Sequence, residues 1–387
     1  MSDTEERIAT SSSGSAGLGL SAAEEEKILT ASQWKLMWWK FRRHKMAMFG
    51  AAFVLLMYFI AAFCEFLAPY PLDKRDAGHV TAPPQLIRFV DSEGKFHLRP
   101  FVYGLKESID PYTWRRTFSE DRTQVYPVYL FVRRDEYKFW GRWTTNLHLF
   151  GVKGEKETCY LLGTDSLGRD LFSRIMYGAR ISLSVGLLGV FISLIIGAVL
   201  GGVSGYYGGV IDNVMQRLIE VLRSIPTIPL WMALSAALPP GLPPQQTYFG
   251  ITLVLAIIGW TGLARVTRGK ILSLRDEDFV MAARIGGTSE GRIIVRHLLP
   301  SFFSYLIVSV TLSIPGMVMG ETSLSFLGLG MRPPYTSWGV LLSEAQNIGN
   351  IAHRPWMLIP ALFLIATVFA FNFLGDGLRD AADPYAR

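Results

Sequence analysis

The residue types that most often carry out chemistry are thinly spread along this sequence. The six histidines include no HExxH motif or other ligand pair, and Cys64 and Cys159 have no metal-binding spacing. The chain also lacks a GxxxxGK(S/T) motif, so it has no phosphate-binding loop of the ATPase type. No set of His, Asp, Ser and Cys converges at one depth, as a membrane enzyme would require. We expect no catalytic residue, metal or cofactor in this chain.

Charged residues beside or within apolar runs are the next candidates. Glu220 has Arg217 and Arg223 three residues away on either side, so both arginines reach it on a helix. This pattern fits an ion cluster at the membrane interface or, alternatively, a role at the inner mouth of a pathway. Glu321 is the only charged residue between 298 and 331, and it suits either a pathway or gate, or a hydrogen-bonding role near the outer boundary. By size and polarity, two further pathway candidates are Trp260 and Asn372.

The stretch DEDFVMAARIGGTSEGRIIVRHLLP, at 276–300, is charged and broken by glycine although it lies between two apolar runs. Its three acidic residues favour a helix N-terminus, and Gly286 and Gly287 favour a stop about two turns later. So short a helix is marginal in water by itself. Its exposed apolar and small residues favour insertion into a groove of another protein, and packing on its own bundle is the alternative.

The length of the uncharged runs indicates a polytopic membrane protein. The 387 residues are 50% hydrophobic and 18% charged, and a bilayer core of ~30 Å needs about 20 helical residues per span. The run 224–264 is too long for one span, and its PPGLPPQQ sequence at 239–246 predicts a turn. An all-α membrane fold with six transmembrane helices is therefore expected, at 47–67, 180–202, 213–236, 248–266, 302–322 and 356–376.

Lysine and arginine are unevenly distributed among the loops. Five lie in 35–45 and seven in 265–296, whereas the PPGLPPQQTY loop has none. Because cytoplasmic loops carry the excess of these residues, both termini are predicted to be cytoplasmic. Topology thus explains the isoelectric point of about 9.2, and the basic residues form no single patch for nucleic acid.

The N-terminal region divides into a tail and a helix. Residues 1–32 are rich in Ser, Gly, Ala and Glu and are expected to be disordered in the cytoplasm. Residues 33–46 predict an interfacial amphipathic helix before the first span. Its apolar face is expected to consist of Trp34, Met37, Trp38 and Phe41.

Residues 68–178 predict a β-rich extracytoplasmic insertion between the first two spans. Its expected strands lie in LIRFV and FHLRPFVYG, in VYPVYLFVRR, and in LHLFGVKGEKETCYLLG. The insertion suits a cover over the mouth of a pathway, a contact for a delivery protein, or a stabilising element. The chain ends with a predicted cytoplasmic tail at 377–387.

The 276–300 loop resembles the EAA loop of ABC importer permeases, whose pattern is E-A-A-x3-G-x9-I-x-L-P. Ala282, Ala283, Gly287, Leu299 and Pro300 match it, whereas Met281 replaces the glutamate and His297 replaces the isoleucine. The resemblance implies a coupling helix that contacts an ATPase. The residues it assigns to that contact are Phe279, Met281, Ala282, Ala283, Arg284, Gly286, Gly287, His297, Leu299 and Pro300.

A second stretch, LGTDSLGRDLFSRIMYGARISL at 162–183, resembles the segment before the second span in C-type permeases of the dipeptide/oligopeptide subfamily. GYYGG, ETSLSFLGLG and the closing LGDGLRDAADPYAR resemble the same subfamily. An outer-face signature is assigned by this resemblance to Gly163, Thr164, Asp165, Gly168, Arg169, Asp170, Arg174 and Arg180.

The resemblance implies a type I ABC importer fold, with an ABC transmembrane type-1 domain at 179–376, in a bacterial inner membrane. It implies a B-type permease partner, two ATP-binding subunits that bind ATP and Mg, and an extracytoplasmic binding protein for peptides. Relatives that carry nickel, glutathione or oligosaccharides leave those cargoes open. A secondary transporter or channel is the competing class, and it predicts ionisable clusters and inverted repeats that are not evident here.

Overall fold

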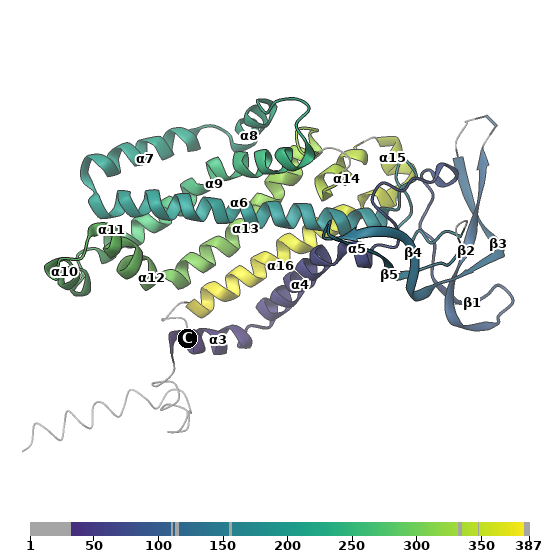
Figure 1. The fold of residues 1–387 in the computed structure, drawn as a ribbon, viewed down its shortest axis with the longest axis horizontal. Coiled ribbons are helices and arrows are strands. Elements are labelled where there is room, and N and C mark those ends of the chain that lie inside the picture. The colour runs from purple at the N-terminus through teal and green to yellow at the C-terminus, as the bar shows by residue number, and fades with distance from the viewer. Residues whose placement is uncertain are drawn as a thin grey trace, which may run out of the picture.

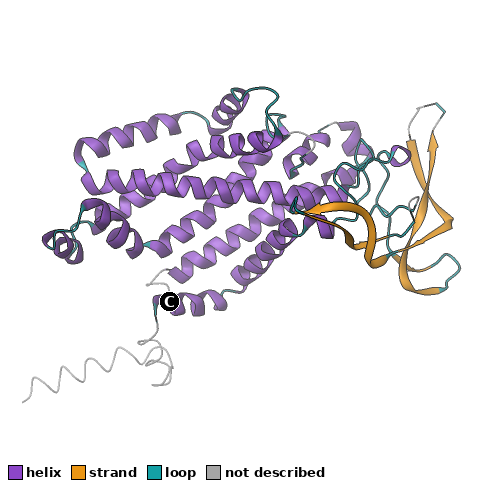
Figure 2. Ribbon diagram, in the orientation of Figure 1, coloured by secondary structure: helices purple, strands orange, loops and turns teal. Residues whose placement is uncertain are grey.

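The computed structural model describes residues 32–109, 111–112, 116–154, 157–331, 335–346 and 348–382. Segment 1–31 of the tail expected to be disordered lies outside the described residues, as does 383–387. The described part is a bundle of long helices with a strand-rich region at one end and the helix α10 at the other (Figure 1). Within these described ranges, strands occur only at the end where the insertion lies (Figure 2).

The helical elements follow the order of the chain. They are α3 Gln33–Arg43, α4 Lys45–Ala62, α5 Cys64–Leu67, η1 Ala77–His79, α6 Leu171–Tyr207, α7 Gly209–Ser224, α8 Thr227–Ala236, α9 Pro244–Leu274, α10 Asp278–Ile285, α11 Glu290–Arg292, η2 Ile293–Leu298, α12 Leu299–Ser301, α13 Phe303–Phe326, α14 Trp338–Glu344, α15 Ile348–His353, η3 Pro355–Leu358 and α16 Ile359–Ala382.

Among the described residues, five helical stretches are long and apolar enough to cross a membrane. They are α4, α6, α9, α13 and the stretch 355–382. The span expected at 213–236 is different, because α7 and α8 are bent by 88° at a short break. Pro226 lies at that break, where its missing N–H and fixed φ interrupt a continuous helix. The described residues therefore contain five candidate spans by length and composition, or six if the bent pair is one broken span.

Glycines on one face of α6 bring it close to α9. A Cβ added at Gly201 would lie 2.3 Å from the carbonyl oxygen of Ala264, and one at Gly205 would lie 2.8 Å from that of Arg268. Gly197 likewise faces the carbonyl oxygen of Trp260 at 3.0 Å. Small residues at this spacing allow two backbones to approach in lipid. These glycines therefore form a packing surface between α6 and α9.

Gly201→Ala should destabilise the bundle by about 1–3 kcal/mol, because the added methyl group forces α6 away from α9. The melting temperature of the detergent-purified chain measures this loss. Gly262→Ala is the matched control, since a Cβ at Gly262 in α9 meets nothing within 4 Å. Equal melting temperatures for the two variants would refute the close-packing explanation.

The strands form two antiparallel groups at one end of the bundle. One sheet has the order β1-β2-β3, with β1 Arg88–Val90, β2 Phe96–Ile109 and β3 Arg116–Pro127. The other is the hairpin of β4 Tyr129–Phe139 and β5 Trp143–Gly151. The β-rich character is thus present, with two differences from expectation. The charged strand β3 begins well before 125, and 157–163 forms no strand.

The N-terminal helix α3 packs on the end of the last helix. Met37 and Phe41 are buried beside Ala47 and Ala381, whereas Trp34 and Trp38 are each more than half exposed. Of the four residues on the expected apolar face, two therefore pack against the protein and two are exposed. An interfacial position for Trp34 and Trp38 remains a prediction.

Candidate coupling and outer-face sites

The 276–300 loop forms a short helix with a glycine stop, as its sequence predicts. α10 ends at Ile285, and Gly287 has a φ of +76°, a conformation in which glycine avoids the Cβ penalty. The N–H of Thr288 donates to the carbonyl of Ala283 at 3.0 Å, and the N–H of Gly287 donates to that of Arg284 at 3.0 Å. This pair of bonds is a Schellman motif, which satisfies the last carbonyls of the helix.

One side of α10 is held on its own bundle. Val280 is fully buried in a cluster that includes Ile271 and Ile293, and Ala283 packs against the same cluster. The guanidinium of Arg284 lies 5.0 Å from the ring centroid of Tyr206 and donates to its hydroxyl at 3.1 Å. α10 is therefore fixed to the end of α6.

The opposite side of α10 is exposed and apolar. Phe279 and Met281 are more than 40% exposed, and Ile285 is 87% exposed. Ala282 and Gly286 are also exposed. One face of α10 therefore packs on its own bundle, as one interpretation of the sequence requires, and the other face is exposed. Insertion of the exposed face into a groove of a partner stays a prediction. Val280 and Ile285 were not assigned to the site from sequence, although they share its helix.

The second half of the loop is less regular than a single helix. Glu290 follows the turn and accepts a hydrogen bond from the hydroxyl of Tyr207 at 2.7 Å. His297 lies half-buried in η2, a π-helical segment. Leu299 packs against the same cluster as Val280, and Pro300 is exposed at the start of α12. Of the matched motif residues, Ala283 and Leu299 pack within this chain.

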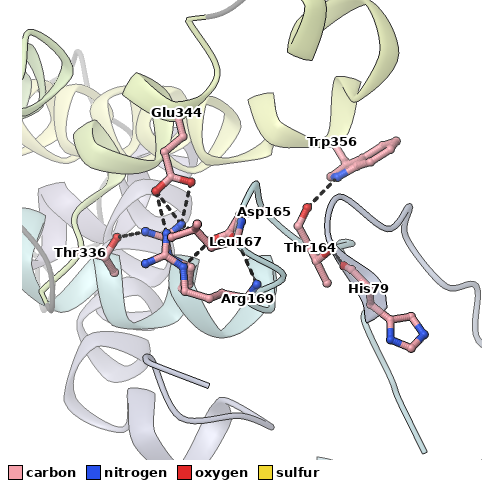
Figure 3. Close-up of polar contacts among 9 residues, drawn as sticks. His79, Thr164, Asp165, Leu167, Arg169, Thr336, Glu344 and Trp356 are labelled. Atoms are coloured by element: carbon pink, nitrogen blue, oxygen red, sulfur yellow. Dashed lines mark hydrogen bonds and ion pairs between the residues drawn. The ribbon is translucent and has the colours of Figure 1, made fainter. Parts of the chain in front are cut away.

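Thr164 of the outer-face signature joins three parts of the fold. Its N–H donates to the carbonyl of Ala82 at 2.9 Å, and its hydroxyl accepts from the N–H of Ala82 at 2.7 Å. The same hydroxyl donates to the carbonyl of His79 at 2.5 Å. The indole of Trp356 donates to the carbonyl of Thr164 at 3.2 Å, as Figure 3 shows. Gly163 and Gly168, both with positive φ, shape the turn around it.

A buried ion network lies beside Thr164 (Figure 3). Asp165 accepts from Arg169 Nε at 2.6 Å and from Arg174 Nη1 at 2.5 Å. Glu344 of α14 accepts from Arg169 Nη2 at 3.0 Å and from Arg174 Nη1 at 2.8 Å. Arg174 is only 2% exposed and Asp165 1% exposed, so each charge needs its partners. The network ties the start of α6 to α14.

Asp170 caps α6 and is buried. Its carboxylate accepts from the N–H and the hydroxyl of Ser173, at 2.8 Å and 2.6 Å. Burial raises the pKa of Asp170 to about 7, although the bonds from Ser173 oppose the shift. The hydroxyl of Ser173 in turn accepts from the N–H of Tyr70 at 3.2 Å, so the cap reaches into the segment after α5.

Arg180 binds the end of the first span. Its Nη2 lies 2.5 Å from a carboxylate oxygen of Glu65, and its guanidinium also donates to the carbonyls of Ala61 and Ala62, at 2.8 Å and 2.9 Å. The signature residues on α6 therefore make two separate sets of contacts. Arg174 belongs to the ion network at the start of the helix, and Arg180 binds the end of α4. Glu65, like Glu344 in the network, was not found from sequence, because its partner is 115 positions away.

Arg174→Met should cost about 3–5 kcal/mol, because it leaves buried carboxylates with fewer cations. A lower melting temperature and a lower yield of folded chain in membranes would measure this. Arg122→Met on β3 removes an exposed arginine and should change stability by less than about 0.5 kcal/mol. A similar melting temperature in both variants would contradict a structural role for the network.

The pathway candidates occupy different environments. Glu321 is fully buried in α13 and accepts from the hydroxyls of Ser182 and Ser325, at 3.0 Å and 2.6 Å. Trp260 is 6% exposed and packs with Ile219 in a small cluster between α7 and α9. Asn372 is half-buried in α16. The structure does not bring the three together at one contact, and a pathway role for each stays a prediction.

Glu220 forms a surface ion pair on α7. Arg217 donates to it at 2.9 Å, and both side chains are more than half exposed. A stronger pair on α7 was missed from sequence. Asp212 binds Arg268 of α9 through both carboxylate oxygens at 2.5 Å and also accepts from Ser204 of α6.

A bundle of candidate membrane spans with a partly exposed loop helix at one end fits an integral membrane protein that binds a partner at that end. Family comparison agrees and is more specific. Residues 179–387 match the family described as binding-protein-dependent transport system inner membrane component, and residues 32–84 match the N-terminal TM domain of oligopeptide transport permease C. The chain belongs to this family of ABC importer permeases.

Individual relatives support the same assignment. The chain is 42% identical to the oligopeptide transport system permease protein OppC of Haemophilus influenzae over 63% of this chain and 76% of that protein. It is 43% identical to the dipeptide transport system permease protein DppC of Bacillus subtilis, over 58% and 68%. It is 34% identical to the glutathione transport system permease protein GsiD of Escherichia coli O1:K1, over 91% and 90%.

An inward-facing structure of the MetNI methionine ABC transporter aligns with a TM-score of 0.44 and 20% identity, over 54% of this chain and 96% of that chain.

As a family member, the chain is a multi-pass inner-membrane component and not an enzyme. ATP hydrolysis belongs to separate ATPase subunits, and the family works with another permease and with substrate-binding components.

Proposed function

We propose that this chain is the C-type half of a heterodimeric importer that carries peptides. A B-type permease forms the other half of the pathway, two ATPases bind at the cytoplasmic face, and an extracytoplasmic binding protein delivers the cargo. The observation that carries the proposal is the divided surface of α10: Val280 anchors it to the bundle, while Phe279, Met281 and Ile285 remain exposed. An amphipathic helix with such a face suits insertion into a groove.

Glutathione is a second candidate cargo. The relative named for glutathione transport aligns over 91% of this chain, whereas the first oligopeptide relative aligns over 63%. Binding measurements on the binding protein encoded beside this chain, with peptides and with glutathione, distinguish the two cargoes.

The orientation of the chain follows from its path through the bundle. α6 starts at the end where the strands lie and finishes at the end where α10 lies, and α9 runs in the same sense (Figure 1). The segment between them must return, so we assign α7 and α8 together as a sixth, broken span. With six spans both termini would lie on the side of α10, and the excess of lysine and arginine in 265–296 supports a cytoplasmic position for that side.

The outer-face residues suit a rigid support instead of a cargo site. The charged side chains of this region form ion pairs with one another, namely Asp165, Arg169, Arg174 and Glu344. In the proposed mechanism this network makes the insertion, α6 and α14 move as one body when the two permeases alternate their access. Glu321, bonded between α6 and α13, is proposed to hold these helices together at the pathway.

Purification of the tagged chain from membranes should recover two ATP-binding subunits and a second permease. The family's interfaces are expected to survive mild detergent. A chain with its 276–300 loop deleted is the control, and it should lose the ATPases while it keeps the other permease. Recovery of the wild-type chain without any ATP-binding subunit would overturn the proposed assembly.

Gly287→Leu should weaken ATPase docking or uncouple ATP hydrolysis from uptake, because a branched side chain strains the backbone at a φ of +76°. Uptake and ATPase rates in proteoliposomes measure the effect, and an uptake loss of about tenfold corresponds to ~1.4 kcal/mol. Gly287→Asn is the control at the same position, since asparagine tolerates this conformation. Normal uptake by the leucine variant would refute the role of the turn.

A further inference from the structure

The turn of the β4–β5 hairpin is joined to the end of the first span. The indole of Trp140 donates to the carbonyl of Ala62 at 2.7 Å, and the ring of Phe139 lies 5.9 Å from that of Phe63. Trp140 also stacks on Phe139, with centroids 5.5 Å apart. Ala62 is the last residue of α4, so the hairpin turn and Arg180 together pair a carbonyl at the end of this helix.

This contact fixes the depth of the turn in the membrane. α4 has 18 residues, which extend over about 27 Å, close to the thickness of the hydrocarbon core. In the proposed orientation, its last carbonyl is therefore expected near the outer boundary of that core. Trp140 is held at this boundary, where tryptophan is favoured because its ring is apolar and its N–H is polar.

The surface around the turn is aromatic and basic. Trp140 and Trp143 are 56% and 58% exposed, and Phe59 on the last turns of α4 is 52% exposed. Lys138 and Arg142, beside the two tryptophans in sequence, are exposed as well. An apolar surface with cationic residues at its edge complements the acyl chains and the phosphate of a phospholipid.

A groove runs from this turn between α4 and α6. Its volume is about 500 Å³, within the range of small-molecule sites. Mostly apolar side chains form its walls, and Arg180, which is paired with Glu65, is the charged residue among them. The lining residues are Tyr58, Ala61, Ala62, Trp140, Arg180, Leu183, Ser184 and Leu187.

We propose that this groove is a binding site for one phospholipid of the outer leaflet. Both walls belong to membrane spans, so the groove lies in hydrocarbon and an acyl chain is the occupant that its apolar lining accepts. Trp140 sits at the level of the lipid carbonyl groups, and Lys138 and Arg142 face the phosphate. The hairpin then anchors the insertion to the membrane surface and restricts its movement relative to α4. The partner permease is the competing occupant.

Photo-crosslinking of the assembled importer tests the site. Benzoylphenylalanine is placed at Trp143, or at Leu98 on β2 as the control, which is 88% exposed but belongs to the other sheet. The importer is illuminated in nanodiscs of phosphatidylethanolamine and phosphatidylglycerol and analysed by intact-mass spectrometry. A phospholipid adduct at position 143 and none at position 98 is the expected result. A protein adduct at 143, no adduct, or equal lipid adducts at both positions would overturn the proposal.

Charge reversal tests the head-group contact separately. Lys138→Glu with Arg142→Glu should reduce the phosphatidylglycerol adduct at position 143 severalfold, since both side chains would then repel the phosphate. The residues are exposed, so folding and ATPase activity should remain at the wild-type level and report that the importer is intact. An unchanged adduct in the double variant would show that these two residues do not bind the lipid.

Discussion

The buried guanidinium of Arg174 is the constraint on which the outer half of the molecule depends. A cation that is 2% exposed is tolerated only where carboxylates surround it, and here Asp165 and Glu344 do so. These two partners come from the turn before α6 and from α14, so satisfying one charge fixes two distant segments. Thr164, next to Asp165, adds hydrogen bonds to the first part of the insertion and to Trp356.

α6 is held in a comparable way at its other end. Asp212 accepts from Ser204 of α6 and from Arg268 of α9, which binds α7 to both helices. Between the Arg174 network and the Asp212–Arg268 pair, the glycine face of α6 lies directly on the backbone of α9. The middle of the bundle thus relies on close packing, and its charges are concentrated toward the ends, as the cost of burying charge in lipid requires.

The sequence allows prediction of those features that depend on local chemistry. The long apolar runs locate five spans, and Gly286–Gly287 locates the end of α10. Tertiary pairing is harder, because Glu344 and Glu65 contact arginines more than 100 positions away and no local pattern marks them. The bend between α7 and α8 was missed because hydropathy records how apolar a segment is and not whether it is straight.

Met281 shows how local sequence and tertiary contact together determine the exposed surface of α10. A glutamate at this position would lie three residues from Arg284, within reach of an ion pair along the helix. With methionine there, the sulfur lies 3.8 Å from Arg284 Nη1, and the guanidinium lies over the ring of Tyr206 at the end of α6. Glu290 binds the neighbouring Tyr207 in the same region. The loop is therefore attached to α6 through two adjacent tyrosines, and a displacement of α10 by a partner would reach α6 directly. α6 is one uninterrupted helix of 37 residues that runs from this loop to the network around Arg174. In the proposed mechanism it would therefore transmit such a displacement without a hinge.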